Sequence, residues 1–226
     1  MLFKLIARLP FHHLSYSYYR STPKVILLDD LKLAYIPIPK VAHTAIKMAI
    51  AKLPLSAEAR AHQLDYIQVP QAQLDRQQYY CFAFVRNPLI RLISLYERNI
   101  NEEYPAHLFF RYGTVFRHKM EFSDFVKAVC NIPDRRADKH FRSQHCFLVH
   151  NGEMLCDFIG KVENFQDDWD YINQRYPIGP VKQVNFSMKK DLSSYFTPDL
   201  FEMAVKRYQR DIELLGYEED VKEMMP

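Results

Sequence analysis

The sequence predicts an α/β fold with a central, mostly parallel sheet flanked by helices, and three observations lead to this prediction. An apolar run at 33–38 and a β-branched, aromatic run at 79–85 are typical of buried strands, and the second lacks the alternation of a half-exposed strand. Each run leads into a helical pattern within a few residues. The 226 residues, 48% of them hydrophobic, suffice for one large core. We therefore predict a single domain over 1–226, with an N-terminal extension at 1–22 and a core at about 24–217.

Other segments supply the remaining strands and helices. We interpret the last helix as structural, with Thr197 as its N-cap and Gly216 as the left-handed residue that ends it. The further predicted elements are strands at 25–28, 31–36 and 157–161 and helices at 42–53, 57–64, 123–130 and 198–215.

Composition and charge argue against several classes of function. The formal charge of +3 fits an anionic ligand held in one place better than a nucleic-acid backbone, so we predict no nucleic-acid partner. A glycine count of 5 argues against collagen-like and propeller designs. The glycine-rich loop GxxxxGK[ST] is absent from the sequence, as are an EF-hand and any regular His/Cys ligand spacing. We therefore predict no metal and no ATP hydrolysis.

The four cysteines show no CxxC spacing, which favours reduced thiols and a cytoplasmic location. Cys81 lies in a strand pattern, where a buried free thiol is usual, and Cys146 with Cys156 is the pair that could form a disulfide. Residues 1–20 have too short an apolar core to span a membrane. This segment either packs on the domain as a helix, which we favour, or makes a peripheral membrane contact.

The stretch 35–47, YIPIPKVAHTAIK, joins the first buried strand to a helix that begins near residue 43. The first N–H groups of a helix have no intrahelical acceptor and attract anions. Lys40 at the tip adds a full charge, and Thr44 adds a hydroxyl donor. The pattern indicates an anion site, although a Pro-Lys turn before a helix is also ordinary architecture.

A second strand–helix unit supports the anion-site interpretation. Arg86 follows the strand at 79–85, and Pro88 suits the first turn of a helix. Leu89, Leu92, Ile93 and Tyr96 form the predicted core stripe of that helix. The other face is predicted to carry Arg91, Ser94 and Arg98. Because ligands of open α/β sheets bind at the carboxyl ends of strands, we expect Arg86 and Ser94 to converge on one anion.

The motifs of both units resemble those of a known family. PKVAHT (39–44) and FAFVRNPLIRLISLY (82–96) are similar to the two cofactor-binding motifs of sulfotransferases that use 3′-phosphoadenosine-5′-phosphosulfate (PAPS). The resemblance is to the carbohydrate branch, which includes the chondroitin, dermatan and HNK-1 sulfotransferases and bacterial relatives. It runs from about 30 to 217 and implies a P-loop-like three-layer fold. Later segments match in family order: HFRSQ (140–144), DFIGKVENFQDDW (157–169), VNFS (184–187) and YFTPDLFEMAVKRYQRDIELLGY (195–217).

The resemblance also implies roles for individual residues. Lys40 would contact the bridging region and stabilise charge on the departing phosphate, Arg86 would pair with the 3′-phosphate, and Ser94 would donate a hydroxyl. His43 stands where relatives often carry Cys, and Ala45 where a hydroxyl residue is common; backbone donors survive both changes. The cofactor-binding residues implied by the resemblance are Pro39, Lys40, Val41, Ala42, His43, Thr44, Arg86 and Ser94.

Sulfuryl transfer needs a base for the acceptor hydroxyl, and two residues are candidates. His140 opens the HFRSQ segment, with a surface histidine in a basic loop as the alternative interpretation. Glu163 follows the strand at 157–161, with an acid that complements a helix dipole as the alternative. Asn185 and Ser187 either approach the nucleotide or belong to a closing strand.

The predicted function is transfer of the sulfuryl group from PAPS to a hydroxyl of a carbohydrate or glycolipid, with the product PAP leaving in line. A non-catalytic PAP-binding relative is one alternative, suggested by His43 and Ala45. A P-loop-like nucleotide kinase is the other, and the missing glycines and the Arg86–Ser94 pair argue against it. Eukaryotic relatives are Golgi membrane proteins whose anchor this sequence lacks, so we predict a cytoplasmic enzyme, with the Golgi lumen as the alternative for a chain trimmed of its anchor.

Overall fold

The computed structural model describes residues 23–53, 66–102, 108, 111–181 and 194–226. The predicted N-terminal extension, the helix expected at 57–64, and the candidate residues Asn185 and Ser187 lie outside this part of the chain. None of the helices in the described part is both long enough and apolar enough to cross a lipid bilayer.

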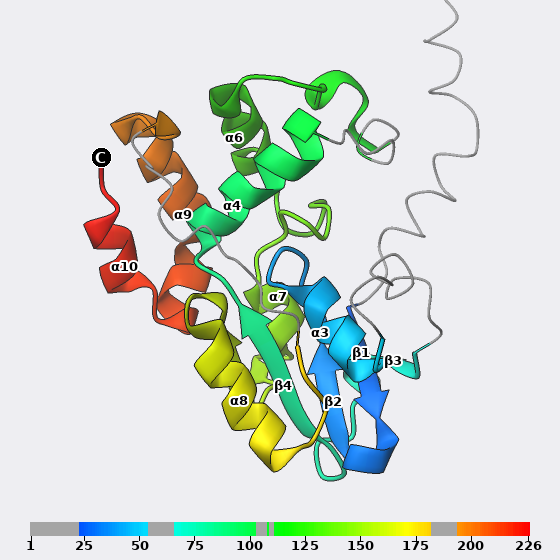
Figure 1. Ribbon diagram of the computed structural model, residues 1–226. Helices are drawn as coiled ribbons and strands as arrows, with labels where there is room; N and C mark the ends of the chain where they lie inside the picture. Colours follow the sequence, from blue (N-terminus) through cyan, green and yellow to red (C-terminus); the bar gives the residue numbers. More distant parts are fainter. Residues whose placement is uncertain (1–22, 54–65, 103–107, 109–110, 182–193) are drawn as a thin grey trace, which may run out of the picture.

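A five-stranded sheet forms the centre of the fold, in the order β3-β1-β2-β4-β7 (Figure 1). The neighbours β2, β4 and β7 pair in parallel, whereas β1 is antiparallel to both β2 and β3. These ladders confirm the predicted mostly parallel sheet. The strand bounds are β1 Lys24–Leu28, β2 Leu33–Ile36, β3 Gln68–Pro70, β4 Tyr80–Val85 and β7 Phe158–Lys161, with a separate hairpin of β5 Val149–His150 and β6 Glu153–Met154.

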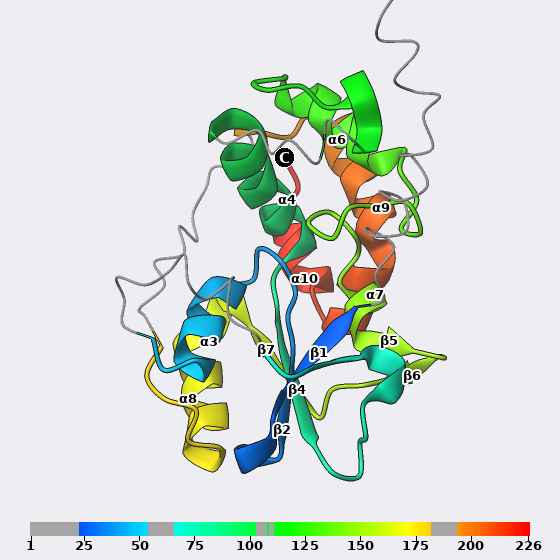
Figure 2. The ribbon, with the colours of Figure 1, turned by 90° about the vertical axis from the view of Figure 1, so that its right-hand side faces the viewer.

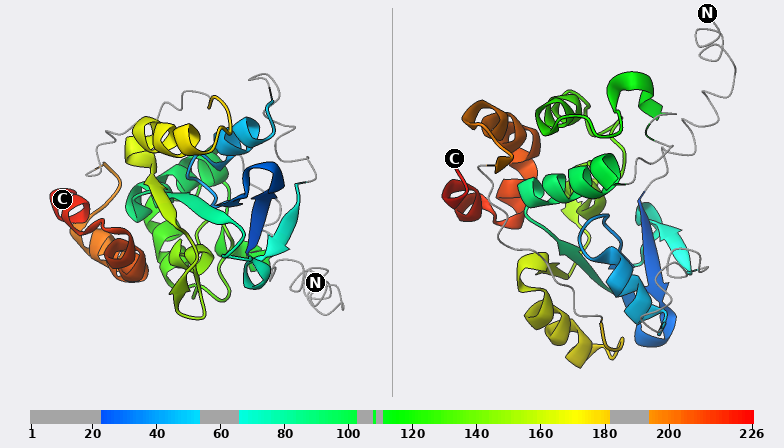
Figure 3. Two further views of the ribbon diagram at one scale, coloured as in Figure 1. Left: turned by 90° about the horizontal axis from the view of Figure 1, so that it is seen from below. Right: turned by 45° about the horizontal axis from the view of Figure 1, so that its top comes forward.

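Helices cover the sheet on both faces and at one end. Figures 2 and 3 show α3 and α8 on one face, with α7 and the β5–β6 hairpin on the opposite face. The helices α4, α6 and α9 pack on one another beyond the carboxyl ends of the parallel strands. Their bounds are α3 His43–Ile50, α4 Pro88–Tyr96, α6 Phe122–Cys130, α7 His145–Leu148, α8 Phe165–Arg175, α9 Pro198–Leu215 and α10 Glu218–Glu223.

The central strand β4 explains why the sequence pattern lacks alternation. Residues 81–85 are buried on both faces, so side chains on either side of the strand meet apolar neighbours. Gly160 of β7 lies opposite Phe84, and a Cβ atom added at Gly160 would lie 2.6 Å from the Phe84 ring. A glycine is therefore required where the aromatic ring of β4 crosses β7.

Several predicted boundaries differ from the structure by a few residues. The strand expected at 31–36 begins at Leu33, because residues 29–31 form a 3₁₀ turn (η1, Asp29–Leu31) and Lys32 has a left-handed φ of 50°. The helix expected at 42–53 ends at Ile50. The last helix has the predicted caps: Thr197 accepts from the Leu200 N–H, and Gly216 adopts φ 65°.

The topology brings three loop entrances to one edge of the sheet. β2, β4 and β7 are adjacent and parallel, so their carboxyl ends at Ile36, Val85 and Lys161 lie side by side. Ligand sites of open α/β sheets form at such an edge.

Candidate active site

The loop that follows β2, residues 39–44 (hereafter the Lys40 loop), has an unusual backbone. Lys40 and Ala42 both have positive φ, 71° and 61°, a conformation that costs a non-glycine residue roughly 1 kcal/mol or more. Ala42 is the N-cap of α3, and its side chain provides no capping hydrogen bond. Left-handed turns of this kind gather main-chain N–H groups around a concave anion site, and the first N–H groups of a helix point the same way. The predicted strand–loop–helix arrangement is thus present in the backbone, and binding of an anion there stays a prediction.

Positive charge is concentrated around Lys40. Burial first, and then repulsion by Arg98, Arg86 and Arg91, lowers the pKa of Lys40 to about 8, against a weaker opposite effect of Glu102. Three cations that act on a half-buried fourth favour the binding of an anion, which relieves their repulsion. The surroundings of Lys40 therefore suit a ligand with several negative charges.

Asn99 orients the Lys40 side chain through a hydrogen bond. The Nζ group of Lys40 donates a 3.0 Å hydrogen bond to Oδ1 of Asn99. Asn99 lies in a π-helical turn, η4 (Glu97–Glu102), which continues α4. Such turns are rare and recur at functional sites. The sequence reasoning missed Asn99, because a π turn leaves no recognisable spacing.

Arg86 follows β4 and is only 9% exposed. Its backbone is held by Gln144: the Arg86 N–H donates to Oε1 at 3.0 Å, and Nε2 donates to the Arg86 carbonyl at 2.7 Å. Burial lowers the pKa of Arg86, and Glu163 opposes this effect. An arginine stays protonated nonetheless, so this corner presents a fixed cation.

The second predicted anion site differs from the first in how its helix begins. Oδ1 of Asn87 caps α4 by accepting from the N–H groups of Leu89 and Ile90 at 3.0 and 3.3 Å. An anion at this unit must therefore be held by side chains rather than by the first turn of the helix. Ser94 is half-buried on α4, and its convergence with Arg86 on one anion stays a prediction.

Arg91 is predicted to share the face opposite the core stripe with Ser94 and Arg98, yet it is itself buried, with 2% of its surface exposed. Ser94 is half-buried and Arg98 is exposed. Two loops and α9 cover α4 at Arg91. The guanidinium instead donates to three main-chain carbonyl oxygens, those of Pro39 (3.0 Å), Arg142 (3.0 Å) and Lys139 (3.2 Å).

The segment 138–144 (hereafter the His140 segment) carries the first candidate base. Nδ1 of His140 lies 2.6 Å from Oδ1 of Asp138, whose side chain is 2% exposed. An ionised carboxylate only accepts hydrogen bonds, so Asp138 places the imidazole proton on Nδ1 and orients the ring. The sequence reasoning missed Asp138, although the D-x-H spacing allows this contact.

Both carboxylate oxygens of Glu163 accept hydrogen bonds. Oε1 accepts from the Asn87 N–H at 2.8 Å, and Oε2 accepts from the hydroxyl of Tyr217 at 2.9 Å. Burial first and Glu163 second raise the pKa of Tyr217, so its hydroxyl stays protonated as a donor. These contacts give Glu163 a structural task at the start of α4, and they make His140 the stronger candidate base.

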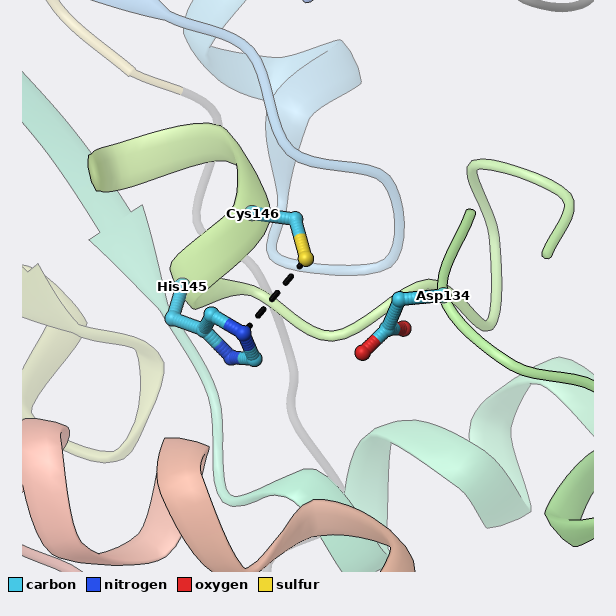
Figure 4. Close-up of side chains that lie close together, drawn as sticks. All are labelled: Asp134, His145 and Cys146. Atoms are coloured by element: carbon cyan, nitrogen blue, oxygen red, sulfur yellow. Dashed lines mark hydrogen bonds between the residues drawn. The ribbon is translucent and has the colours of Figure 1, made fainter. Parts of the chain in front are cut away.

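Three side chains that offer ligand atoms for a metal ion lie close together: Asp134, His145 and Cys146 (Figure 4). Their ligand atoms lie within 4.8 Å of one another. Each carboxylate and imidazole already has a partner, however: Arg207 pairs with Asp134 at 2.7 Å, and Asp211 holds Nδ1 of His145 at 2.7 Å. Burial, with Asp134 and Asp211, raises the pKa of the Cys146 thiol to about 12. We interpret this group as a tether between the His140 segment and α9.

Residues 23–218 match the sulfotransferase family. Mouse carbohydrate sulfotransferase 11 is 22% identical over 222 residues, which cover 83% of this chain and 63% of the mouse protein. Zebrafish carbohydrate sulfotransferase 14 is 23% identical over 234 residues, with 85% and 62% covered. The chain thus spans less than two thirds of the length of these relatives. No solved structure matches it significantly.

The matched range contains all five strands of the sheet, the Lys40 loop, Arg86 and the His140 segment. The chain therefore belongs to the sulfotransferase family.

Proposed function

We propose that this protein transfers the sulfuryl group of PAPS to a hydroxyl of a carbohydrate or glycolipid. The observation that supports the proposal most directly is Lys40, a half-buried cation that three arginines repel, on a loop with two left-handed residues. A phosphosulfate and a second phosphate carry several negative charges, which complement this group of cations. PAPS, when bound, supplies an activated sulfuryl group on a phosphate that can leave.

The residues of the Lys40 loop hold the 5′ end of the donor in this proposal. Lys40 would hold the phosphosulfate end of the donor and stabilise charge on the departing phosphate, and the first N–H groups of α3 would add partial positive charge. Arg86 and Ser94 hold the 3′-phosphate. His43 and Ala45 leave these main-chain donors in place, so both departures from the family pattern are compatible with binding.

His140 takes the proton of the acceptor hydroxyl through Nε2, because Asp138 holds Nδ1. Glu163 is the second candidate for this role. Lys40 and the loop N–H groups supply the charge stabilisation, so the proposed mechanism calls on no metal.

The acceptor class rests on the names of the relatives, which are carbohydrate sulfotransferases. A cytoplasmic location is proposed on the state of the thiols. All four cysteines are free, and the sulfur atoms of Cys81 and Cys156 lie 3.8 Å apart, in hydrogen-bond contact rather than in a disulfide. These thiols fit a reducing compartment.

Transfer of ³⁵S from labelled PAPS to a panel of glycans and glycolipids, in the presence of EDTA, tests the proposal. Labelled glycan with the native protein, and none with Lys40→Ala, is the expected result. PAP binding without transfer to any acceptor would favour a non-catalytic relative. Transfer of ³²P from ATP only in the presence of Mg²⁺ would favour a kinase.

A further inference from the structure

The buried guanidinium of Arg91 is hydrogen-bonded to two loops: the Lys40 loop, which holds PAPS in the proposed function, and the His140 segment, which carries the candidate base. Nε of Arg91 donates to the carbonyl of Pro39, the first residue of the Lys40 loop. Nη1 and Nη2 donate to the carbonyls of Arg142 and Lys139, which flank the candidate base. The Lys40 loop and the His140 segment are about a hundred residues apart in the sequence, and Arg91 is a direct link between them.

The chemistry of this contact requires an arginine. A guanidinium is planar and rigid, so its three donors fix the two loops at one separation and one angle. A lysine at the same position keeps the charge but has a single nitrogen, which cannot reach both loops with the same geometry. Burial lowers the pKa of Arg91, and nearby Asp211 and Asp134 partly offset this effect. Removing the side chain would leave one buried and two partly buried carbonyl groups of the two loops without this donor.

We propose that Arg91 is a positioning residue that couples the Lys40 loop to the His140 segment, so that a bound donor nucleotide orders the candidate base. The proposal rests on the proposed function for the identity of the ligand. Arg91 acts through the carbonyls of Pro39, Lys139 and Arg142, and both loops share one rigid partner. Ligand binding that orders the Lys40 loop therefore also stabilises one position of His140.

Arg207 provides a matched control for this proposal. Its guanidinium is also largely buried and also anchors the neighbourhood of the His140 segment, through Asp134 (2.7 Å) and the hydroxyl of Ser143 (2.9 Å). It reaches the segment from α9 through Asp134 and Ser143, whereas the carbonyl of Pro39 is held by Arg91. A general loosening of the segment should appear in both variants, whereas coupling to the Lys40 loop should be lost only with Arg91.

The experiment compares native protein, Arg91→Lys and Arg207→Lys by hydrogen–deuterium exchange, with and without PAP, and by calorimetric titration with PAP. In the native protein PAP should slow exchange in both 39–44 and 138–144. Arg91→Lys should bind PAP at least tenfold more weakly and lose the protection of 138–144 even at saturating PAP. Arg207→Lys should bind PAP within twofold of native and keep that protection.

The proposal is overturned if saturated Arg91→Lys protects 138–144 as the native protein does. A native chain that fails to bind PAP would refute the proposed function. In that case the coupling is tested by hydrogen–deuterium exchange of the proteins without ligand. Arg91→Lys must then speed exchange in both loops, and Arg207→Lys only in 138–144. Arg91→Gln, which keeps two N–H donors without the charge, replaces Arg91→Lys if that variant does not fold.

Discussion

Lys40 Nζ lies 3.0 Å from Oδ1 of Asn99, and this hydrogen bond closes the Lys40 loop against the π-helical turn that continues α4. The amide oxygen is neutral, so it orients the ammonium group without cancelling its charge. Lys40 therefore remains available to an anionic ligand while its direction is fixed. The same helix that carries Arg91 and Ser94 thus also controls the side chain at the tip of the loop.

Replacing Lys40 should remove most of the activity. We expect Lys40→Ala to lower kcat/KM by about 10³-fold, because one well-aimed donor to a developing negative charge is worth about 10²–10³ in rate. Asn99→Ala should cost only about tenfold, since the charge is kept and its direction alone is lost. Steady-state assays with labelled PAPS measure both effects. Lys40→Ala with more than a tenth of native activity would exclude this role for Lys40.

The affinity for PAP should fall at alkaline pH. The pKa of Lys40 is lowered to about 8, so Lys40 is cationic below pH 8 and increasingly neutral above it. A bound phosphate favours the cation, hence affinity is full below about pH 8 and declines as the pH rises through that value. Phosphate groups lose their last proton near pH 6 and do not change in this range.

Calorimetric titration of PAP between pH 7 and 9.5 measures this decline, with Lys40→Arg as the matched control. An arginine stays charged throughout, so its affinity should be nearly constant over the range. An equal alkaline decline in Lys40→Arg would assign the effect to another group.

Arg86 should contribute mainly to binding. We expect Arg86→Ala to raise the Kd for PAP about 30-fold, which corresponds to about 2 kcal/mol for charge-assisted hydrogen bonds to a phosphate. Ser94→Ala should raise it about fivefold. Arg175→Ala is the control, because Arg175 is an α8 residue that stacks on Tyr80 far from the Lys40 loop in the fold. Equal effects of the Arg86 and Arg175 changes would refute the assignment.

Local sequence patterns were sufficient to predict the frame of the site. The buried strand at 79–85 and the Pro-Lys turn before α3 are recognisable because each depends on residues next to one another in the chain. Parallel pairing of β2 with β4 then places Lys40 and Arg86 at the same edge without further information.

Contacts between distant segments could not be predicted in the same way. Arg91 lies outside the predicted core stripe, and the packing of the Lys40 loop, the His140 segment and α9 against α4 buries it. Gln144 binds the backbone of Arg86, a contact that no side-chain pattern encodes. The strands predicted from periodicity depend on local sequence, whereas these polar contacts depend on which loops the fold brings together.

Gly160 should be required for stability rather than for chemistry. An added methyl group would lie 2.6 Å from the ring of Phe84, so Gly160→Ala should destabilise the fold by about 1–3 kcal/mol. Phe84→Leu in the same chain should recover part of that loss by making room. Urea denaturation of the single and double variants measures the coupling. Strictly additive effects would show that the ring and the methyl group do not compete.

Replacing His140 and Glu163 separately should show which of them is the base, because the two variants are expected to differ in kcat and in melting temperature. His140→Gln should lower kcat by about 10²–10⁴ with PAP affinity and melting temperature nearly unchanged, because loss of a general base affects the chemical step alone. Glu163→Gln should instead lower the melting temperature, since the carboxylate holds both the Asn87 N–H and the hydroxyl of Tyr217. A large loss of kcat in Glu163→Gln at native stability would transfer the role of base from His140 to Glu163. Asp138→Ala then discriminates further: if His140 is the base, removing the carboxylate that orients its ring must lower kcat without weakening PAP binding.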